Sequence, residues 1–441
     1  MEAKAINRLR LDPEKIILYR GLHLLLADRY GMISSNEQGY FYEQTRFISK
    51  HELHVQGERI KPASCNAVEP HSSVSYSTLR SPAGCEGAPK RDPDSGSGEV
   101  VEKGIEIQVN TYIGGGYHQD VHVINHTLAS AAITLKLIFA ADFADLKADF
   151  ADLKDVESGK REQSAPIERK FETMSQGKGQ LTFSYQHPDI NHATRIRVAA
   201  PCDLGDEGAS LRAKLILPPR KPEIISIDIS SSFLGETIEP WYGLDGRMME
   251  HSPAKVSSSN WLNSCVRLES SNPGVQDIWD RAIADLGSLH SLQGENGELF
   301  TPMGGIPKYA ALFGRDALMA SIQSALLNPE TLKGSLLSVG KWTAAVRDDR
   351  YDAQAGRCYI SASSVPLLCS AIRPLCIIMG IIRHRLSISS PRRCTLLIRR
   401  TGSSSPWSGT RSARPSIGWI ETAISTATDF MNIAPSLAKP G

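Results

Sequence analysis

The chain has 441 residues and a net charge of +1, with 41% hydrophobic and 22% charged residues. This length suits two or three domains with cores of their own. The balanced charge provides no global basic field, so we expect neither nucleic acid nor a membrane as a partner. None of the eight cysteines forms a C-x-x-C pair, which disfavours a zinc or redox-dithiol site. The N-terminus shows no basic and apolar leader, so we expect a cytoplasmic protein, and we predict no cofactor.

The apolar stretch "VPLLCSAIRPLCIIMGII" (365–382) is the single membrane candidate. It contains Arg373 and two prolines, and it is barely long enough to span a bilayer. We therefore expect no transmembrane helix.

Residues 1–250 are expected to form an antiparallel β-sandwich. Apolar and polar residues alternate in several runs that Gly, Pro and Asp clusters separate, as is typical of short strands. The runs are 105–112, 133–139, 180–185, 194–200 and 223–230.

The apolar period changes to that of a helix from about Ser271. Ser271 or Asn272 can cap the first helix, with Pro273 in its first turn. Two more helices are expected at about 313–327 and 329–346. We therefore predict a linker at 251–270 and a helical segment at 271–356.

Three histidines and three glycines offer weaker signals. His118, His122 and His126 are evenly spaced, so a strand would place them on one face. They fit a metal site or, more simply, a solvated polar face. The run "GGG" (114–116) lacks the residues of a phosphate loop and is interpreted as a bulge or turn.

Two regions resemble a known family. "GYFYEQTRFISKHELHVQGERI" (39–60), together with "YIGGGYHQDVHVIN" and "LIFAADFADL", resembles the N-terminal domain of bacterial and archaeal glycogen debranching enzymes of the amylo-α-1,6-glucosidase type. Gln44 stands where that family has Asp. "GGIPKYAALFGRDALMASIQSALL" (304–327) is similar to the family's entry into its (α/α)6-barrel catalytic domain, with Lys308 replacing Trp and Ala317 replacing Ser.

The resemblance covers roughly residues 15–356. It implies an N-terminal antiparallel β-sandwich followed by the first helices of an (α/α)6 barrel, truncated here. It also implies that Arg315 and Asp316 bind hydroxyls of a terminal glucose in an α-glucan such as glycogen or maltodextrin. Guanidinium donors and carboxylate acceptors can together satisfy vicinal hydroxyls. The alternative is a structural ion pair at a helix start.

No pair of catalytic carboxylates is evident. Hydrolysis of a glucosidic bond needs an acid and a base. In the family these lie well downstream of the Arg-Asp pair, yet residues 357–441 contain only Glu421 and Asp429 as acids. We therefore assign no catalytic residue in this chain.

The composition changes abruptly at about residue 357. From there on the chain has ten Arg and one Lys against one Glu and one Asp, a net of +9, which leaves −8 for residues 1–356. The same 85 residues hold fifteen serines and four of the eight cysteines. No helical period runs through them, and we expect a disordered tail.

The genetic code provides a test of this tail. Read two bases later, Met431–Asn432 encodes Glu without choice, and Phe430–Met431 encodes Tyr or His. The shifted frame permits "GKMLHQ", then "YYYGDHSSP", then "NGDINGDGFYEY". These resemble the family's continuation, in order. We therefore hypothesise a frameshift near Gly356, the alternative being a genuine divergent tail.

These observations favour a cytoplasmic glucan-debranching glucosidase in truncated, catalytically incomplete form. The second hypothesis is a non-catalytic carbohydrate-binding β-sandwich protein, and the third is a decayed gene product without function.

Overall fold

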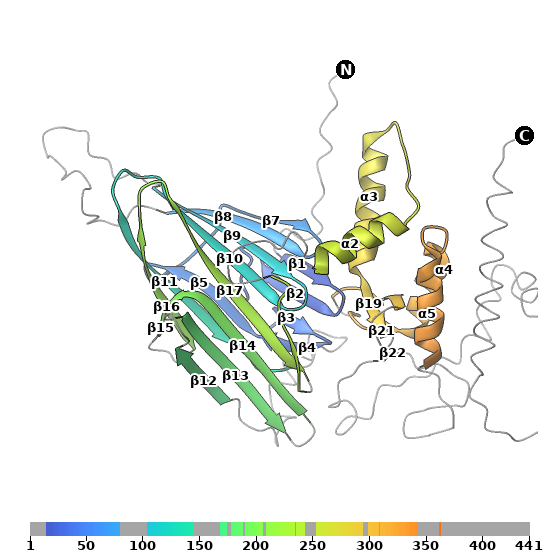
Figure 1. Ribbon diagram of the computed structural model, residues 1–441, viewed down its shortest axis with the longest axis horizontal. Coiled ribbons are helices and arrows are strands. Elements are labelled where there is room, and N and C mark those ends of the chain that lie inside the picture. Colours follow the sequence, from blue (N-terminus) through green and yellow to red (C-terminus); the bar gives the residue numbers. More distant parts are fainter. Residues whose placement is uncertain are drawn as a thin grey trace, which may run out of the picture. The chain divides into compact units, whose positions relative to one another are not determined.

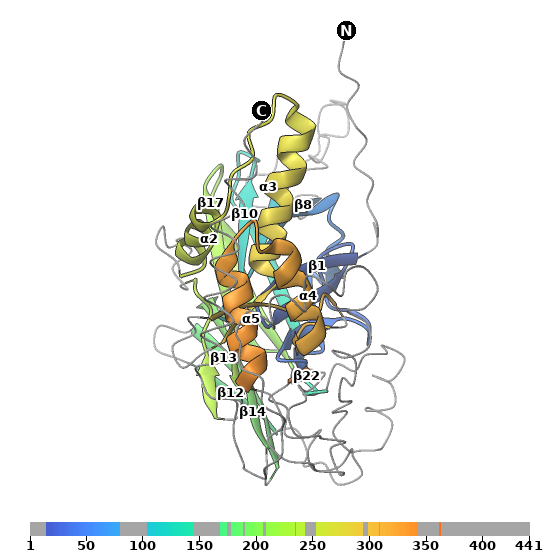
Figure 2. The same cartoon turned by 90° about the vertical axis from the view of Figure 1, so that its right-hand side faces the viewer.

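The computed structural model describes the following residues: 15–79, 104–144, 168–173, 178–187, 190–205, 209–233, 235–242, 253–293, 299–307, 309–341 and 361–362. The chain divides into two compact units, Met1–Ser259 and Asn260–Gly441. The first is built from strands, and the second is mostly helical (Figures 1 and 2).

A nine-stranded antiparallel sheet dominates the first unit and fans across Figure 1. Its main path runs in the order β12-β13-β14-β17-β10-β9-β8-β7, and β18 pairs with β17. The bounds are β12 (Glu168–Thr173), β13 (Lys178–His187), β14 (Ile190–Pro201), β17 (Pro222–Phe233), β18 (Glu236–Ile238), β10 (Tyr117–Asn125), β9 (Ile105–Ile113), β8 (Ser72–Leu79) and β7 (Ser64–Glu69).

Two smaller antiparallel sheets complete the first unit. The five-stranded sheet consists of β15 (Asp203–Leu204), β16 (Ser210–Leu217), β11 (Ala131–Ala140), β5 (Lys50–Val55) and β6 (Glu58–Arg59). The four-stranded sheet consists of β1 (Lys15–Arg20), β2 (His23–Asp28), β3 (Gly39–Tyr42) and β4 (Thr45–Ile48).

The core lies between the apolar faces of these sheets. Buried and half-exposed residues alternate along β9 and β11, as the period-2 pattern requires. His51 of β5 bonds Gln119 of β10 (Nε2 to Oε1, 2.9 Å), which joins the five- and nine-stranded sheets inside the core. Phe47 of β4 packs edge-on against Phe143 at 5.7 Å between ring centroids. The predicted antiparallel β-sandwich is thus confirmed.

In the part of the chain that the structure describes, four helices follow. They are α2 (Pro253–Ser264), α3 (Pro273–Ser288), α4 (Gly314–Ser324) and α5 (Pro329–Lys341). Three short strand pairings accompany them: β19 (His290–Gln293) with β20 (Leu299–Pro302), β21 (Leu312–Phe313) with β22 (Ser361–Ala362), and an isolated bridge between Gly305 and Tyr309. α4 and α5 lie side by side in both views (Figures 1 and 2).

An apolar cluster holds the helical unit together. Trp261, Cys265 and Ile283 are its buried members, and Phe300 stacks on the Trp261 ring at 4.2 Å between centroids. The Trp261 Nε1–H also donates to the Ile283 carbonyl at 2.9 Å. The indole therefore contributes both area and a satisfied hydrogen bond to this core.

The predicted helices are present where the structure describes them. Asn272 is the N-cap of α3: its side chain accepts a hydrogen bond from the Gly274 amide, and Pro273 occupies the first turn. α2 lies inside the range 251–270 that we expected as a linker. Lys308 and nearly all of the tail from 357, including the membrane candidate 365–382, lie outside the described residues. Within the described part of the chain, no helix is long and apolar enough to cross a membrane.

Candidate functional site

Arg315 and Asp316 lie in the first turn of α4. Their side chains are 59% and 42% exposed, and Arg315 Nη2 lies 3.4 Å from Asp316 Oδ1. An ion pair this exposed contributes little to stability. The first turn also favours the Asp316 carboxylate, because the amide groups at a helix N-terminus carry partial positive charge. Both side chains are therefore accessible to a ligand.

The residues around this pair form a compact turn. Ala311 and Leu312 precede α4 and are buried, and Ala317 on the following turn is 0% exposed. A Cβ on Gly304 would lie 2.7 Å from the Phe313 ring, so glycine allows this close approach. Because Ala317 is fully buried, a serine at this position would need a hydrogen-bond partner inside the unit.

The motif at residues 39–60 has a structural role. Arg46 is 0% exposed, and it joins the segment "QTRF" to Asp142 in "AADF" through a two-pronged ion pair (Nε to Oδ1, 3.0 Å). Its Nη1 also donates to the carbonyls of Asn36 and Gln38, at 2.5 and 3.1 Å. A Cβ on Gly39 would lie 2.5 Å from Arg46 Cδ, so glycine is required beside this side chain.

Gln44 occupies a strained position in the same motif. Glu43 and Gln44 connect β3 to β4 with φ values of 46° and 68°, as in the tight hairpin turns that carry two left-handed residues. Asp and Asn tolerate this conformation better than Gln does. The Asp that the resembling family has at this position therefore suits the turn better than Gln44 does. The difference between the two residues concerns the stability of the turn.

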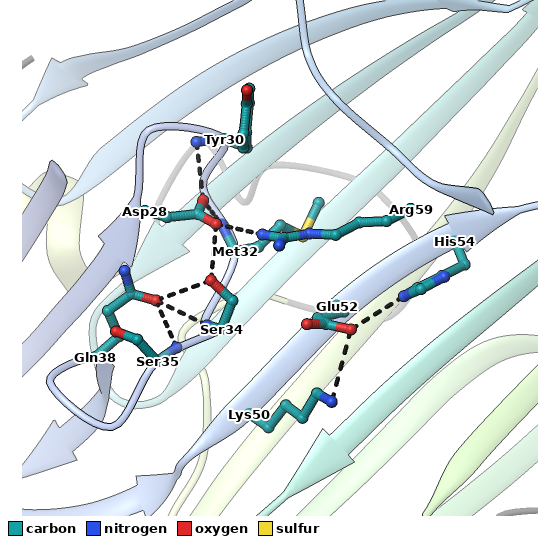
Figure 3. Close-up of polar contacts among 10 residues, drawn as sticks. All are labelled: Asp28, Tyr30, Met32, Ser34, Ser35, Gln38, Lys50, Glu52, His54 and Arg59. Carbon is teal, nitrogen blue, oxygen red and sulfur yellow. Dashed lines mark hydrogen bonds and ion pairs between the residues drawn. The ribbon is translucent and has the colours of Figure 1, made fainter. Parts of the chain in front are cut away.

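Asp28 organises the loop between β2 and β3 (Figure 3). Its Oδ1 accepts hydrogen bonds from the Tyr30 and Met32 amides at 2.8 and 3.0 Å, and its Oδ2 accepts one from Ser34 Oγ at 3.0 Å. Arg59 of β6 completes the cluster with an ion pair. These bonds to neighbouring backbone mark a loop-fixing cluster.

Glu52 lies beside this loop on the outer face of β5 (Figure 3). It accepts from His54 Nε2 at 3.0 Å and lies 3.8 Å from Lys50 Nζ. Its charge is therefore balanced by residues of its own strand.

A buried cluster of charged residues lies on the outer face of the nine-stranded sheet. His118 of β10 lies between two carboxylates: Nδ1 is 2.6 Å from Asp228 Oδ1, and Nε2 is 3.1 Å from Asp120 Oδ1. Asp120 also accepts from Ser226 Oγ at 2.6 Å. The expectation of a merely solvated histidine is wrong for His118, whose side chain is 2% exposed.

The two carboxylates determine the charge of this imidazole. Burial lowers the pKa of His118, but the hydrogen bonds and negative charges of Asp120 and Asp228 outweigh it and raise the pKa to about 9. Burial raises the pKa of Asp120, while the bond to His118 outweighs burial and leaves that pKa below its ordinary value. His118 is therefore an imidazolium at neutral pH.

The segment 239–242 closes over this cluster. Tyr242 stacks on His118 with 5.4 Å between ring centroids. Glu239 accepts from Arg197 Nη2 and Ser230 Oγ, both at 2.6 Å. The segment is thus attached to the sheet by a ring contact and by a carboxylate.

Gly114, Gly115 and Gly116 form the β9–β10 turn, as the turn interpretation predicts. A Cβ on Gly115, whose φ is 61°, would lie 2.3 Å from the Trp241 ring. The turn therefore needs glycine because the indole of Trp241 packs directly on its backbone.

The remaining histidines of the series lie apart from this cluster. His126 Nε2 bonds Glu106 Oε2 at 2.9 Å, and His122 lies half-buried on the outer face of β10. Among the described residues, no group of three or more His, Cys, Asp or Glu could hold a metal ion.

Sequence reasoning missed the His118 cluster. Asp228 is 110 residues away in the sequence, and β10 and β17 become neighbours only in the folded sheet. The even spacing of the histidines was the one available signal, and it drew attention to His118 without showing its partners.

The fold is therefore that of an antiparallel β-sandwich unit followed by a helical unit. Residues 18–228 match the family model described as the N-terminal domain of (some) glycogen debranching enzymes. This match confirms the resemblance of residues 39–60. A comparison with curated protein sequences gave no match.

Solved structures are similar only at low identity. A structure described as a kojibiose phosphorylase from the human microbiome shares 8% identity at a TM-score of 0.45, and the match covers 78% of this chain and 49% of the other. The chain thus spans about half the length of that protein. A structure described as an aldose 1-epimerase from Escherichia coli K12 shares 11% identity at a TM-score of 0.28, with 50% of this chain and 99% of the other covered. The family match over residues 18–228 is the comparison that bears on function.

Proposed function

We propose that this protein functions in α-glucan debranching in the cytoplasm and is a catalytically incomplete relative of amylo-α-1,6-glucosidases. The observation that carries the proposal is the match of residues 18–228 to the N-terminal domain of glycogen debranching enzymes. Its ligand is an α-glucan of the glycogen or maltodextrin type.

Arg315 and Asp316 are the proposed sugar-binding residues. Their exposure at the start of α4 leaves the donors of the guanidinium and the acceptors of the carboxylate accessible. A carboxylate and a guanidinium side by side can bind the adjacent hydroxyls of a terminal glucose. The exposed pair adds little as a structural ion pair, which favours the binding role.

The absence of hydrolysis is the second part of the proposal. An inverting glucosidase needs two carboxylates about 6.5–9.5 Å apart. Residues 357–441 contain only Glu421 and Asp429 as acids, within a segment of net charge +9. A frameshift near Gly356 would account for both features, because the frame two bases later permits sequence of the family's kind.

The binding test uses the purified chain in native gels that contain glycogen. We expect the wild-type protein to be retarded and Arg315→Ala to be retarded less. Arg281→Ala is the matched control, since Arg281 is an exposed arginine that pairs with Asp285 along α3. Equal retardation of all three proteins would contradict the role of Arg315, and no retardation of any of them would contradict glucan binding.

The catalytic test measures glucose released from a branched limit dextrin. We expect none above a blank, and turnover by this chain would refute its incompleteness. The DNA sequence from codon 345 onward tests the frameshift: the shifted frame should stay open and encode acidic, helix-periodic sequence. Early stop codons in that frame would make residues 357–441 a genuine tail.

A second candidate function is carbohydrate binding by the β unit alone. It is favoured by the broad polar face of the nine-stranded sheet, where Ser, Thr, Asn, Gln and charged side chains replace the apolar residues of the inner face. In that case glucan retention would survive Arg315→Ala.

A further inference from the structure

Four residues form a straight row across the outer face of the nine-stranded sheet. Tyr76 of β8 is directly paired with Gln108 of β9, Gln108 with His122 of β10, and His122 with Ile224 of β17. Directly paired residues on antiparallel strands point their side chains to the same face. Three inter-strand spacings make the row about 14 Å long.

The two ends of the row are open to solvent. Tyr76 is 43% exposed and Ile224 is 44% exposed, whereas most aromatic side chains of this unit are buried. Gln108 and His122, between them, are half-buried. The row thus offers an apolar ring at one end, an apolar side chain at the other and polar groups between.

One polar group of the row, the amide of Gln108, is held in place by a neighbour. Gln108 Nε2 donates to Asn110 Oδ1 at 2.8 Å, which fixes the plane of the Gln108 amide. His122 is flanked along its strand by Asp120, whose carboxylate is bound by His118 and Ser226. Planar groups fixed in this way present donors and acceptors at low entropic cost.

The charges of this surface favour a neutral ligand. None of the four residues carries a fixed charge. Two carboxylates flank the row along the strands, Asp120 beside His122 and Glu106 beside Gln108, and each pairs with a histidine, His118 and His126 respectively. A phosphate or a carboxylate would find no arginine or lysine in the row. A neutral chain with apolar faces and hydroxyl edges matches both the tyrosine ring and the amide.

We infer that the row Tyr76–Gln108–His122–Ile224 is a binding site for a linear segment of α-glucan. A sugar ring lies on the Tyr76 ring, and its hydroxyls exchange hydrogen bonds with Gln108 and His122. This inference rests on the proposed function, because it takes the glucan as the ligand, but it uses a site separate from Arg315 and Asp316.

The experiment measures binding of maltoheptaose to the full chain by isothermal titration calorimetry. Tyr76→Ala should weaken binding about tenfold, the factor that corresponds to about 1.4 kcal/mol of lost ring contact. Gln108→Ala should also weaken it, while Tyr76→Phe, which keeps the ring, should stay within about twofold of wild type. Tyr30→Ala is the control, since Tyr30 is a half-buried tyrosine on the β2–β3 loop.

The outcomes separate this inference from the proposed function. Loss of affinity in Tyr76→Ala and Gln108→Ala, but not in Tyr30→Ala, supports the row as the site. Wild-type affinity in both variants overturns it, and if Arg315→Ala then loses binding, the proposed function still stands. No binding by the wild-type chain overturns both. Because Tyr76 is exposed, its variants should unfold at the wild-type temperature, which a thermal melt checks.

Discussion

The β unit and the helical unit cover their apolar side chains very differently. In the β unit, inward-facing residues such as Ile107, Val121 and Ile227 are fully buried. In the helical unit, Ile278 of α3 and Leu326 just after α4 remain 73% and 72% exposed. The β unit also exposes apolar side chains, such as Leu128 and Ile216, but they are scattered over separate elements, whereas those of the second unit recur along its helices.

The exposed apolar residues of the second unit follow a helical period. Met319 and Ile322 lie three residues apart on one side of α4, and Leu326 follows four residues later in the turn after it. On α3, Ile278 is exposed while Ile283 is buried in the Trp261 cluster. Helices that are apolar on two sides are typical of the interior of a larger helical assembly. This pattern favours the proposal that the helices begin a larger domain.

The largest expected effect on stability comes from removing the buried ion pair of the β unit. Asp142→Ala leaves the fully buried Arg46 guanidinium without its carboxylate, which should destabilise the unit by about 3–5 kcal/mol. Urea unfolding followed by circular dichroism in the strand region measures the loss.

The control for this variant is Asp280→Ala in the helical unit. Asp280 is exposed and accepts hydrogen bonds only from Gln276 of its own helix among the interactions described, so its loss should cost less than about 0.5 kcal/mol. Similar losses in the two variants would contradict the contrast between the units.

The next effect depends on pH and is confined to the β unit. The pKa of His118 is about 9 in the folded chain against an ordinary 6.5. Because the folded pKa is raised, the stabilisation is fully present below pH 6.5 and is lost as pH rises through about 9. The shift corresponds to about 3 kcal/mol.

Unfolding by urea at pH 6, 8 and 9.5 tests this expectation. The wild-type chain should lose stability across the series, and His118→Gln should start lower and lose less. His126→Gln, which changes an exposed histidine paired with Glu106, should follow the wild type. A wild-type stability that is constant from pH 6 to 9.5 would show that His118 is not charged in the folded chain.

The smallest expected effect on stability concerns the N-cap of α3 in the helical unit. Asn272→Ala removes the side-chain oxygen that accepts from the Gly274 amide at 2.9 Å and should cost about 1 kcal/mol. Ser271→Ala changes the neighbouring cap candidate and should cost less than about 0.5 kcal/mol. Thermal melts of the two variants compare them, and an equal loss would contradict the assignment of Asn272 as the cap.

The regular elements were predictable where the pattern was strong. β9, β11 and β17 alternate apolar and polar residues, and the strands appear at those positions. β2 was missed because "HLLLAD" is a continuous apolar run that lacks alternation. α2 was missed because its serine-rich sequence has a weak apolar period.

The sites were less predictable than the strands. Arg315 and Asp316 were found from a motif, and the structure places them in the first turn of α4. The row from Tyr76 to Ile224 has no sequence signal, because it joins four strands that span about 150 residues. Its members become neighbours only through strand register, which a single sequence does not reveal.

The attachment of residues 239–242 to the sheet determines where the β unit can be cut for expression. A fragment that ends before Glu239 would remove Trp241 from its glycine turn and Tyr242 from His118, and would leave the imidazolium uncovered. A fragment that ends just after Tyr242 keeps these contacts and every strand of the three sheets. The second boundary is therefore the one that should yield soluble protein for crystallisation.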